Sequence, residues 1–484
     1  MRRLRPAEVG WQLGVAHEPR GGQMWVPWDR TAGVIGPQGS GKTLDLLAPA
    51  LIAAPGAALT TLTKVDDLLL TFSARSRHGR PCVVLDPFGL APGLPEVVWD
   101  PIRGCVDPLV AERRAKAFTA GTVKGAVAGG HADDAARFYA AEAAKVLQGY
   151  FHAAALTGRT LEHVLSWVAK PLAASEPTEI LREHPHAASF WDGLLYGALH
   201  GDDRTAGNTI TTVQQALSLF FQEDIRRRCV PGHGRPATDI ADVIARGGTI
   251  YLLGREDPYA SASPLMTAFA EHVLDTALEA ANASPWGRLC PPFHAILDEL
   301  PSTAPLPTLR TRMANERALG ISFMWAAQAW PQLAAIFGEQ EARTLVGLTN
   351  NLIVFGGSKD VAFNQEISDL LGHVRVSRVG WQTGQMGGRQ VSADDIPIMT
   401  AAEVRQLKER QALVLSENGA PIIAKLHRCI DGKAGRRLLT DQARLREAVG
   451  TDRRRTVTPE GRAIAALVEA RRRGLSHDHE DILS

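Results

Sequence analysis

The sequence predicts an α/β protein in which a mostly parallel sheet is interrupted by an all-α segment. Strand-like and helix-like stretches alternate over the first hundred residues and again after residue 248, which is typical of parallel sheets with crossover helices. Between them, residues 107–228 are rich in Ala and Leu at helical spacing and show almost no β-branched alternation. A chain of 484 residues, 45% of them hydrophobic and 22% charged, is long enough for two or three domains with large cores.

The amino-terminal part supplies the first strands and helices of this pattern. A short apolar stretch ends at Val34-Ile35, and a glycine-rich loop separates it from a helix that we expect over Leu44–Ala54. The next expected elements are a strand at Ala57–Leu62, a helix at Asp66–Ser76 and a strand at Cys82–Leu85.

The strand-and-helix pattern resumes at Gly248–Leu253. A helix is expected over Leu265–Ala281, with further strands at Phe293–Leu297, Ile321–Ala326, Leu352–Phe355 and Ala412–Leu415. We therefore divide the chain into four parts. They are the first half of a nucleotide-binding domain at residues 1–105, an all-α domain at 106–240, the second half of the nucleotide-binding domain at 241–435, and a charged tail at 436–484.

The overall charge excludes a protein that coats nucleic acid with its whole surface. Lys and Arg number 53 against 52 Asp and Glu, which leaves a net charge of +1. A nucleic-acid partner would have to meet a local patch, or a pore that several copies build together. Residues 451–484 hold two runs of three arginines around an amphipathic stretch, Gly461–Glu469. This tail is either a solvated end or an arm that docks on a partner or on nucleic acid.

The cysteines and the apolar stretches favour a cytoplasmic protein. Five cysteines are scattered without a C-x-x-C pair, which fits a reduced compartment. The stretch Leu46–Thr63 has no charge, but Pro49, Pro55 and Gly56 break it into a helix end, a turn and a strand. We therefore expect no transmembrane segment in this chain.

A glycine-rich loop carries the first chemical signal. Residues 36–43 match G-x-x-x-x-G-K-[ST], directly after the first predicted strand and at the start of a helix, which is the context that a phosphate-binding P-loop requires. Inward-turned backbone N–H groups and the helix N-terminus would hold the phosphates of ATP. Lys42 would reach the β- and γ-phosphates, and Thr43 would bind Mg²⁺. The predicted nucleotide-binding residues are Gly36, Pro37, Gln38, Gly39, Ser40, Gly41, Lys42 and Thr43.

Two adjacent acids complete the site that a P-loop ATPase needs. The apolar strand Phe293–Leu297 ends in Asp298 and Glu299. Asp298 would hold the Mg²⁺ shell, and Glu299 would act as the general base toward the attacking water. An adjacent acidic pair after a buried run occurs by chance, but together with the P-loop it predicts ATP hydrolysis and not mere binding.

Two further polar residues have the spacing that motor ATPases use. Arg317 follows Glu299 by 18 residues, and Gln328 follows it by 29 residues at the end of an apolar run. Gln328 would sense the γ-phosphate, and Arg317 would reach the site of a neighbouring copy as an arginine finger. The alternatives are a surface arginine, with Arg310 and Arg312 as rivals, and an ordinary amide at a strand end.

The ordered set of motifs resembles the type IV secretion coupling proteins, the TraG/TraD-like ATPases of bacterial conjugation, and especially their actinobacterial branch. The resemblance covers roughly residues 10–430. The stretches that carry it are the P-loop, residues 10–14, 61–69, 83–89, 99–105, 297–299 and 351–357, and Gln328.

The resemblance implies a RecA-like motor domain interrupted by an all-α domain, acting as a ring of six with nucleotide between subunits. It implies ATP and Mg²⁺ as cofactors and gives Lys42, Thr43, Asp298 and Glu299 the ATPase roles, with Gln328 as sensor and Arg317 as finger. The implied partners are single-stranded DNA with a relaxase complex and the components of a type IV secretion channel. The implied place is the cytoplasmic face of the membrane.

One departure from the family is the lack of the two membrane helices with which many members begin. Either a membrane-anchoring partner recruits this chain, or an anchor precedes this stretch of sequence. Two other functions stay open. One is a double-stranded DNA translocase of the FtsK or HerA kind, which shares the motor core. The other is a secretion receptor that collects protein cargo and uses ATP only for its assembly.

Overall fold

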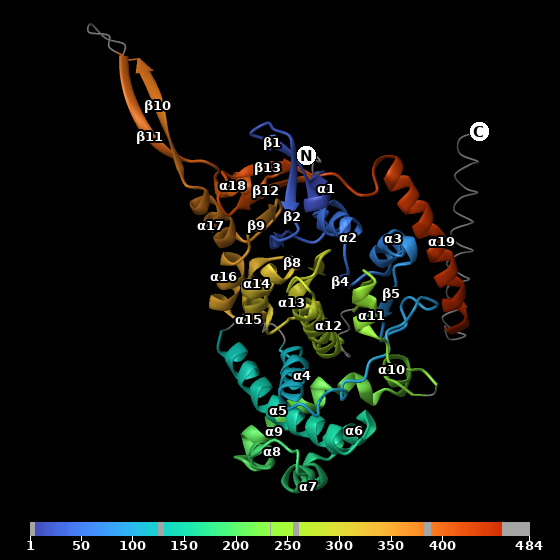
Figure 1. Ribbon diagram of the computed structural model, residues 1–484. Helices are drawn as coiled ribbons and strands as arrows, with labels where there is room; N and C mark the ends of the chain where they lie inside the picture. The colour runs from blue at the N-terminus through green and yellow to red at the C-terminus, as the bar shows by residue number, and fades with distance from the viewer. Residues whose placement is uncertain (1–4, 124–129, 233, 255–260, 382–388, 457–484) are drawn as a thin grey trace, which may run out of the picture.

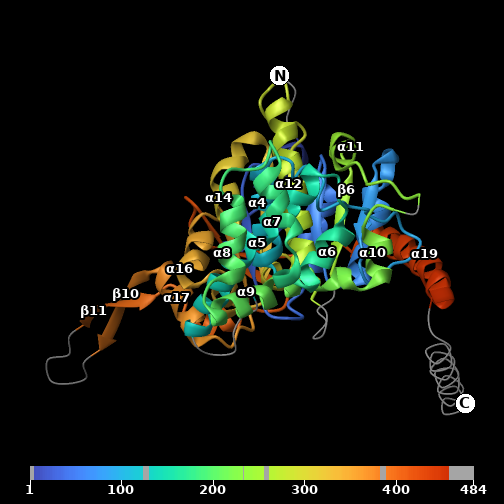
Figure 2. The ribbon, with the colours of Figure 1, turned by 90° about the horizontal axis from the view of Figure 1, so that it is seen from below.

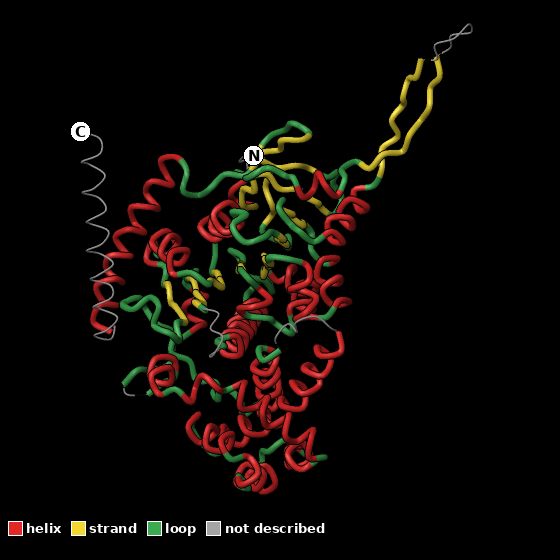
Figure 3. The backbone as a smooth tube through the Cα atoms, turned by 180° about the vertical axis from the view of Figure 1, so that it is seen from behind, coloured by secondary structure: helices red, strands yellow, loops and turns green. Residues whose placement is uncertain are grey.

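The computed structural model describes residues 5–123, 130–232, 234–254, 261–381 and 389–456. Strands gather in the upper part of the molecule in Figure 1, and a body made of helices lies below them. Figure 3 shows the same division from behind, with the strands in yellow and the helices in red. The chain therefore builds a sheet domain and a helical body, as the sequence predicts.

The sheet has eleven strands in the order β2-β1-β13-β12-β9-β3-β8-β7-β4-β6-β5. The seven strands from β9 to β5 pair in parallel, and the four from β2 to β12 add antiparallel pairs at one side. The strands are β1 (Gly10–Glu18), β2 (Gln23–Pro27), β3 (Ala32–Ile35), β4 (Ala58–Leu62), β5 (Cys82–Leu85), β6 (Thr249–Leu253), β7 (Phe293–Leu297), β8 (Ile321–Ala327), β9 (Asn351–Phe355), β12 (Gln411–Ser416) and β13 (Ile422–Lys425). This confirms the prediction of a mostly parallel sheet.

The central strands are apolar along their whole length because both faces of the sheet are covered. Every residue of β3, β4, β6, β7 and β8 is buried. One face packs on α2 (Ala48–Ala53) and α3 (Val65–Arg75), with Leu51 and Leu69 among the buried contacts. The other face packs on α12 (Ser263–Ala283), with Phe269 in its core. Strand β3 thus lies in the middle of the sheet, with its loop at the carboxyl edge.

The helical body lies between β5 and β6 and shares a core with the α12 face of the sheet. Its longest helix, α5, runs from Gly130 to Leu156. In Figure 2 this body faces the viewer below the sheet domain. The other helices of the body are α4 (Pro108–Ala120), α6 (Leu161–Ala169), η3 (Pro171–Ala173), α7 (Glu176–Glu183), α8 (Trp191–His200), α9 (Asp203–Ala216), η4 (Ser218–Phe221), α10 (Glu223–Cys229) and α11 (Ile240–Ala245). The predicted helical segment at residues 107–228 is confirmed in type, and its assignment as a domain at 106–240 stays a prediction.

Helices of the carboxyl-terminal half flank the sheet and connect its later strands. Helix α19 packs against α3 on the side of the molecule away from the β10–β11 hairpin described below (Figures 1 and 2). The remaining helical elements are α1 (Pro6–Val9), η1 (Thr43–Leu47), η2 (Arg77–Gly79), α13 (Leu300–Thr303), α14 (Leu309–Asn315), η5 (Glu316–Leu319), α15 (Trp330–Phe337), α16 (Glu339–Gly347), α17 (Val361–Leu371), α18 (Ala401–Arg405) and α19 (Gly432–Thr456).

The single helix predicted over Leu44–Ala54 is wrong in its first turns. The structure has a π-helical stretch, η1, followed by the α-helix α2. Pro49 has no N–H to donate to the carbonyl of Asp45, so the ordinary α-helical register cannot run through this point. Instead, the N–H of Ala48 donates to the carbonyl of Thr43, five residues back. The helix after the P-loop is therefore wider at its start than a regular α-helix.

The sequence reading omitted a hairpin and three strands that the structure contains. Strands β10 (His373–Trp381) and β11 (Arg389–Pro397) form a two-stranded ribbon that projects from the body in Figure 1. Strands β1, β2 and β13 extend the sheet beside β12. The amphipathic stretch predicted at Gly461–Glu469 lies outside the described residues. Within the described parts of the chain, no helix is both long and apolar enough to cross a bilayer.

Candidate nucleotide site

The P-loop lies at the carboxyl edge of the sheet, between β3 and η1. The N–H of Gly36 donates to the carbonyl of Ala327 at 3.1 Å, which ties the start of the loop to the end of β8. Gly39 and Gly41 have φ angles of +80° and +93°, a backbone conformation that favours glycine. A side chain at Gly41 would also meet the carboxylate of Asp45 at 2.8 Å. Both glycines are therefore required by the path of the loop.

Four of the predicted site residues come together at this edge. The Nζ of Lys42 lies 3.1 Å from Oε1 of Glu299 and donates to the carbonyl of Gly36 at 3.3 Å. The hydroxyl of Thr43 donates to Oδ2 of Asp298 at 3.2 Å. Lys42, Asp298 and Glu299 are all buried, with exposed fractions of 7%, 6% and 9%. The P-loop and the acidic strand end, 255 residues apart in sequence, therefore form one site.

Asp298 is held from two directions. Its Oδ1 accepts the N–H of Glu299 at 3.0 Å, and its own carbonyl accepts the hydroxyl of Thr61 at 2.7 Å. Burial and the neighbouring Glu299 raise the pKa of Asp298 to about 6. Thr61 stands at the end of β4, next to Leu297 of β7. The sequence reading gave Thr61 no part in the site, although its place at the end of a buried strand was visible.

Glu299 adopts a backbone conformation that is unusual for a glutamate. Its φ and ψ are 50° and 45°, in the left-handed region, directly after β7 and before α13. Such residues cost free energy and concentrate at functional sites. Its Oε2 is buried and has no hydrogen-bond partner among the described residues. The side chain therefore has one oxygen on Lys42 and one oxygen free to accept a proton or a hydrogen bond.

The oxygen-rich group around Thr43 fits a magnesium ion. Mg²⁺ prefers hydroxyl and carboxylate oxygens and usually binds proteins through one or two carboxylates. The Thr43 hydroxyl and the Asp298 carboxylate already lie in contact, and both face the P-loop lysine. These two residues would hold the ion. Bound there, Mg²⁺ would neutralise charge on the phosphates.

Gln328 lies at the same edge, directly after β8. Its N–H donates to Oε1 of Gln332 at 3.2 Å, and Nε2 of Gln332 donates to Oγ of Ser302 at 2.9 Å. Ser302 belongs to α13, which begins directly after Glu299. Gln332 therefore links the predicted sensor to the helix that follows the predicted base. The sequence reading missed Gln332, because an amide four residues into a helix carries no signal of its own.

Arg317 lies at the opposite, amino edge of the sheet, in η5 before β8. Its Nη1 donates to Oδ1 of Asn350 at 3.4 Å, and its side chain is partly buried. It does not join Lys42 and Glu299 within one copy, and its role as a trans-acting finger stays a prediction. Its rival Arg310 pairs with Glu341 at 2.8 Å and is half exposed.

Arg312 is excluded as a residue that reaches a neighbouring copy. Its side chain is 6% exposed and pairs with Glu271 at 2.8 Å, Glu316 at 2.8 Å and Asp275 at 2.5 Å. Breaking a buried pair of this kind would leave uncompensated charge. Arg312 therefore fixes α14 and η5 against α12.

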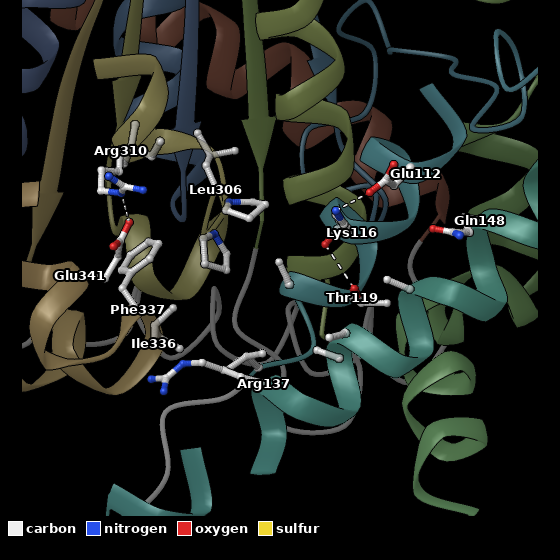
Figure 4. Close-up of a pocket in the computed structure, with 18 of the residues that line it drawn as sticks. Glu112, Lys116, Thr119, Arg137, Gln148, Leu306, Arg310, Ile336, Phe337 and Glu341 are labelled. Carbon is white, nitrogen blue, oxygen red and sulfur yellow. Dashed lines mark hydrogen bonds and ion pairs between the residues drawn. The ribbon is translucent and has the colours of Figure 1, made fainter. Parts of the chain in front are cut away.

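A cavity of about 720 Å³ lies between the helical body and the sheet domain (Figure 4). Its walls are small apolar side chains of α5, the segment Pro305–Arg310 and the end of α15. Ion pairs stand at its rim, Glu112 with Lys116 and Arg310 with Glu341, as the dashed lines show. The predicted catalytic residues do not line it. It therefore belongs to the junction between the two bodies and not to the nucleotide site.

Comparisons with known proteins agree with this arrangement. Residues 292–409 match a family model described as "TraG-D_C: TraM recognition site of TraD and TraG". No curated protein sequence matches the chain. The fold is similar to that of the bacterial conjugative coupling protein TrwBdeltaN70 in an unbound form, with a TM-score of 0.63 and 20% identity, covering 90% of this chain and 91% of that one.

Two nucleotide complexes of TrwB show the same likeness. TrwB in complex with the non-hydrolysable GTP analogue GDPNP has a TM-score of 0.60 and 21% identity, covering 88% of this chain and 90% of that one. TrwB in complex with ADP and Mg²⁺ has a TM-score of 0.59 and 20% identity, covering 88% and 89%. The chain thus has the fold of a conjugative coupling protein and carries the TraG-D_C segment, which confirms the TraG/TraD-like resemblance of its sequence.

Proposed function

We propose that this protein is a Mg²⁺-dependent ATPase that couples a DNA–relaxase complex or a protein substrate to a type IV secretion channel and drives its transfer. The observation that carries the proposal is the pair of contacts Lys42–Glu299 and Thr43–Asp298. These contacts place a phosphate-binding lysine, a metal-binding hydroxyl, a metal-binding carboxylate and a general base in one buried site.

The reaction follows from the positions of these groups. Lys42 and the loop N–H groups bind the triphosphate, and Thr43 and Asp298 hold the ion beside it. Glu299 accepts the proton of the attacking water at its free Oε2. Gln328, tied through Gln332 to α13, senses whether the γ-phosphate is present. Hydrolysis at Glu299 and a shift of α13 are thereby connected in one chain of contacts.

We further propose that the active form is a ring, on the model of six copies, and that it works at the cytoplasmic face of the membrane with an anchoring partner. Arg317 supports the ring, because it lies at the sheet edge opposite to its own P-loop. Coupling-protein structures of the same fold support the role in conjugation. The proposed partners are single-stranded DNA with a relaxase and the components of the channel.

The test is ATP turnover measured with single-stranded DNA, with duplex DNA and without DNA. Stimulation by single strands supports a coupling motor. Stimulation by duplex alone would move the protein to the FtsK or HerA kind of translocase. Turnover that no DNA changes would favour the cargo receptor, and no turnover at all would reject the ATPase.

A further inference from the structure

A second cavity lies beside the P-loop, between α2 and the amino-terminal strands. Its volume is about 570 Å³, within the range of small-molecule sites. Backbone of β1, the ring of Trp25, and Pro49 and Ala53 on one side of α2 form its walls. His427 and Cys429, from the segment after β13, close one end. None of these residues has a part in the chemistry proposed above.

Asp45 connects this cavity to the P-loop. It lines the cavity, yet only 2% of its surface is exposed, and its Oδ1 has no hydrogen-bond partner among the described residues. Its N–H donates to the carbonyl of Gly41 at 2.9 Å, and its carboxylate packs against Gly41 closely enough that a Cβ there would lie 2.8 Å from Oδ2. A buried carboxylate oxygen without a partner costs free energy, and a ligand amine would satisfy it.

The sheet order places this cavity where the far end of a bound nucleotide would lie. Glu299 follows β7, which is separated from β3 by β8 alone. His427 and Cys429 follow β13, on the opposite side of β3, and the N–H of Cys429 donates to the carbonyl of Leu44 at 3.0 Å. A triphosphate with its terminal phosphate at Lys42 and Glu299 therefore directs its base away from β7, toward the β13 side.

We propose that this cavity receives the base of the nucleotide and that Asp45 selects adenine by accepting a hydrogen bond from its exocyclic amino group. This inference rests on the proposed ATPase function and names the specificity-determining residue of the same site. Trp25 supplies ring surface to the cavity wall, which suits a flat heterocycle.

The single free oxygen favours adenine over guanine. Adenine offers one exocyclic amine, which one acceptor satisfies. Guanine presents two adjacent donors beside a carbonyl, and that carbonyl would face the carboxylate side of the cavity. A site that hydrogen-bonds an amine rejects the analogue that lacks it, because the buried acceptor is then left unpaired.

The test compares ATP with purine riboside triphosphate, which is ATP without the 6-amino group. The wild type should have a KM about 10-fold lower for ATP, the scale of one hydrogen bond to a charged group. Asp45→Ala should bring the two KM values within about 2-fold, and Asp45→Asn, which keeps a carbonyl acceptor, should retain most of the difference. Because the two substrates share the same triphosphate, damage to the P-loop changes both KM values alike and leaves their ratio unchanged.

A second variant approaches the cavity from its far end. Ala53 is exposed, lies on α2 and lines the cavity. Ala53→Trp should raise the KM for ATP severalfold while inhibition by inorganic tripolyphosphate, which has no base, stays unchanged. An unchanged ratio in Asp45→Ala, an equal KM for both substrates in the wild type, or a preference for GTP over ATP would overturn the inference while ATPase activity still stood. Absence of all turnover would instead count against the proposed function.

Discussion

The ammonium of Lys42 lies 3.1 Å from the carboxylate of Glu299, so the P-loop lysine and the predicted base form an ion pair across the carboxyl edge of the sheet. Their side chains are only 8% and 11% exposed. A pair shielded in this way is screened little by salt. A phosphate that binds Lys42 competes with Glu299 for the same charge, and phosphate binding is thereby tied to the freedom of the base.

Replacing Lys42 with Ala should abolish ATP turnover. The substitution removes the charge that binds the β- and γ-phosphates, and nucleotide binding should weaken with it. Steady-state phosphate release and nucleotide titration check both effects. Arg310→Ala, a half-exposed arginine outside the site, is the matched control and should turn over near the wild-type rate. Near-normal turnover in Lys42→Ala would reject the assigned site.

Replacing Glu299 with Gln should separate binding from hydrolysis. Thr43 and Asp298 remain to hold the ion, so Mg·ATP still binds, while turnover should fall at least ~10²-fold because the general base is lost. Binding and single-turnover hydrolysis are measured side by side on the same preparation. If the variant hydrolyses ATP at the wild-type rate, the base is a different residue.

Replacing Arg317 with Ala should inactivate the assembly without harming its own P-loop. Arginine fingers contribute about 10³–10⁵ in rate, so the variant alone should be nearly inactive. Mixing it with Lys42→Ala should restore part of the activity, because a mixed interface pairs an intact P-loop with an intact finger. Turnover per subunit should also rise with protein concentration. An inactive mixture, or full activity in dilute monomer, would contradict a role in trans.

His294, on the strand that ends at Asp298, should make the protein less stable in mild acid. Burial lowers the pKa of His294 to about 3, and its Nδ1 lies 2.5 Å from the Ser322 hydroxyl. The folded state therefore refuses a proton that the unfolded state accepts below about pH 6.5. This group's contribution is complete above pH 6.5 and falls by about 1.4 kcal/mol per pH unit below it.

The variant His294→Asn keeps a polar partner for Ser322 and cannot take up the proton. We expect it to be less stable than the wild type at pH 7.5, with the gap narrowing between pH 6.5 and pH 5.5. Urea midpoints at pH 7.5, 6.5 and 5.5 measure the gap. His272, whose pKa burial also lowers to about 3, is present in both proteins and cancels. Parallel pH profiles would show that His294 does not carry the acid sensitivity.

The sequence predicts the parallel strands and the core of the site well, for a physical reason. Strands such as Phe293–Leu297 are buried on both faces, so they read as short apolar runs, and the carboxyl ends of parallel strands meet at one edge. That rule is enough to bring Lys42 and Glu299 together. The site's supporting residues Thr61, Gln332 and Asp45 are single polar residues without spacing to mark them. Only their three-dimensional neighbours reveal them.

The omitted strands lack the signal that marked the central ones. The hairpin strand His373–Trp381 mixes Arg, Ser and Val and has no core to face. Strand β1 is only partly buried along its length, and its partner β13 is a short run of four residues. The pairing of β1 with β13 depends on contacts between the two ends of the chain, which no local pattern encodes.

That pairing has a consequence for the birth of the protein on the ribosome. Val15 of β1 stands opposite Lys425 of β13, so the first strand to leave the exit tunnel waits for one of the last. The helical body, whose contacts are local, can settle during synthesis, whereas β1 and β2 have only each other until the final tenth of the chain arrives. An exposed pair of edge strands is a site of mispairing with other chains. Maturation of the nucleotide site's neighbourhood is therefore a post-translational event, and a nascent chain truncated before β13 is the form most exposed to aggregation and to capture by chaperones.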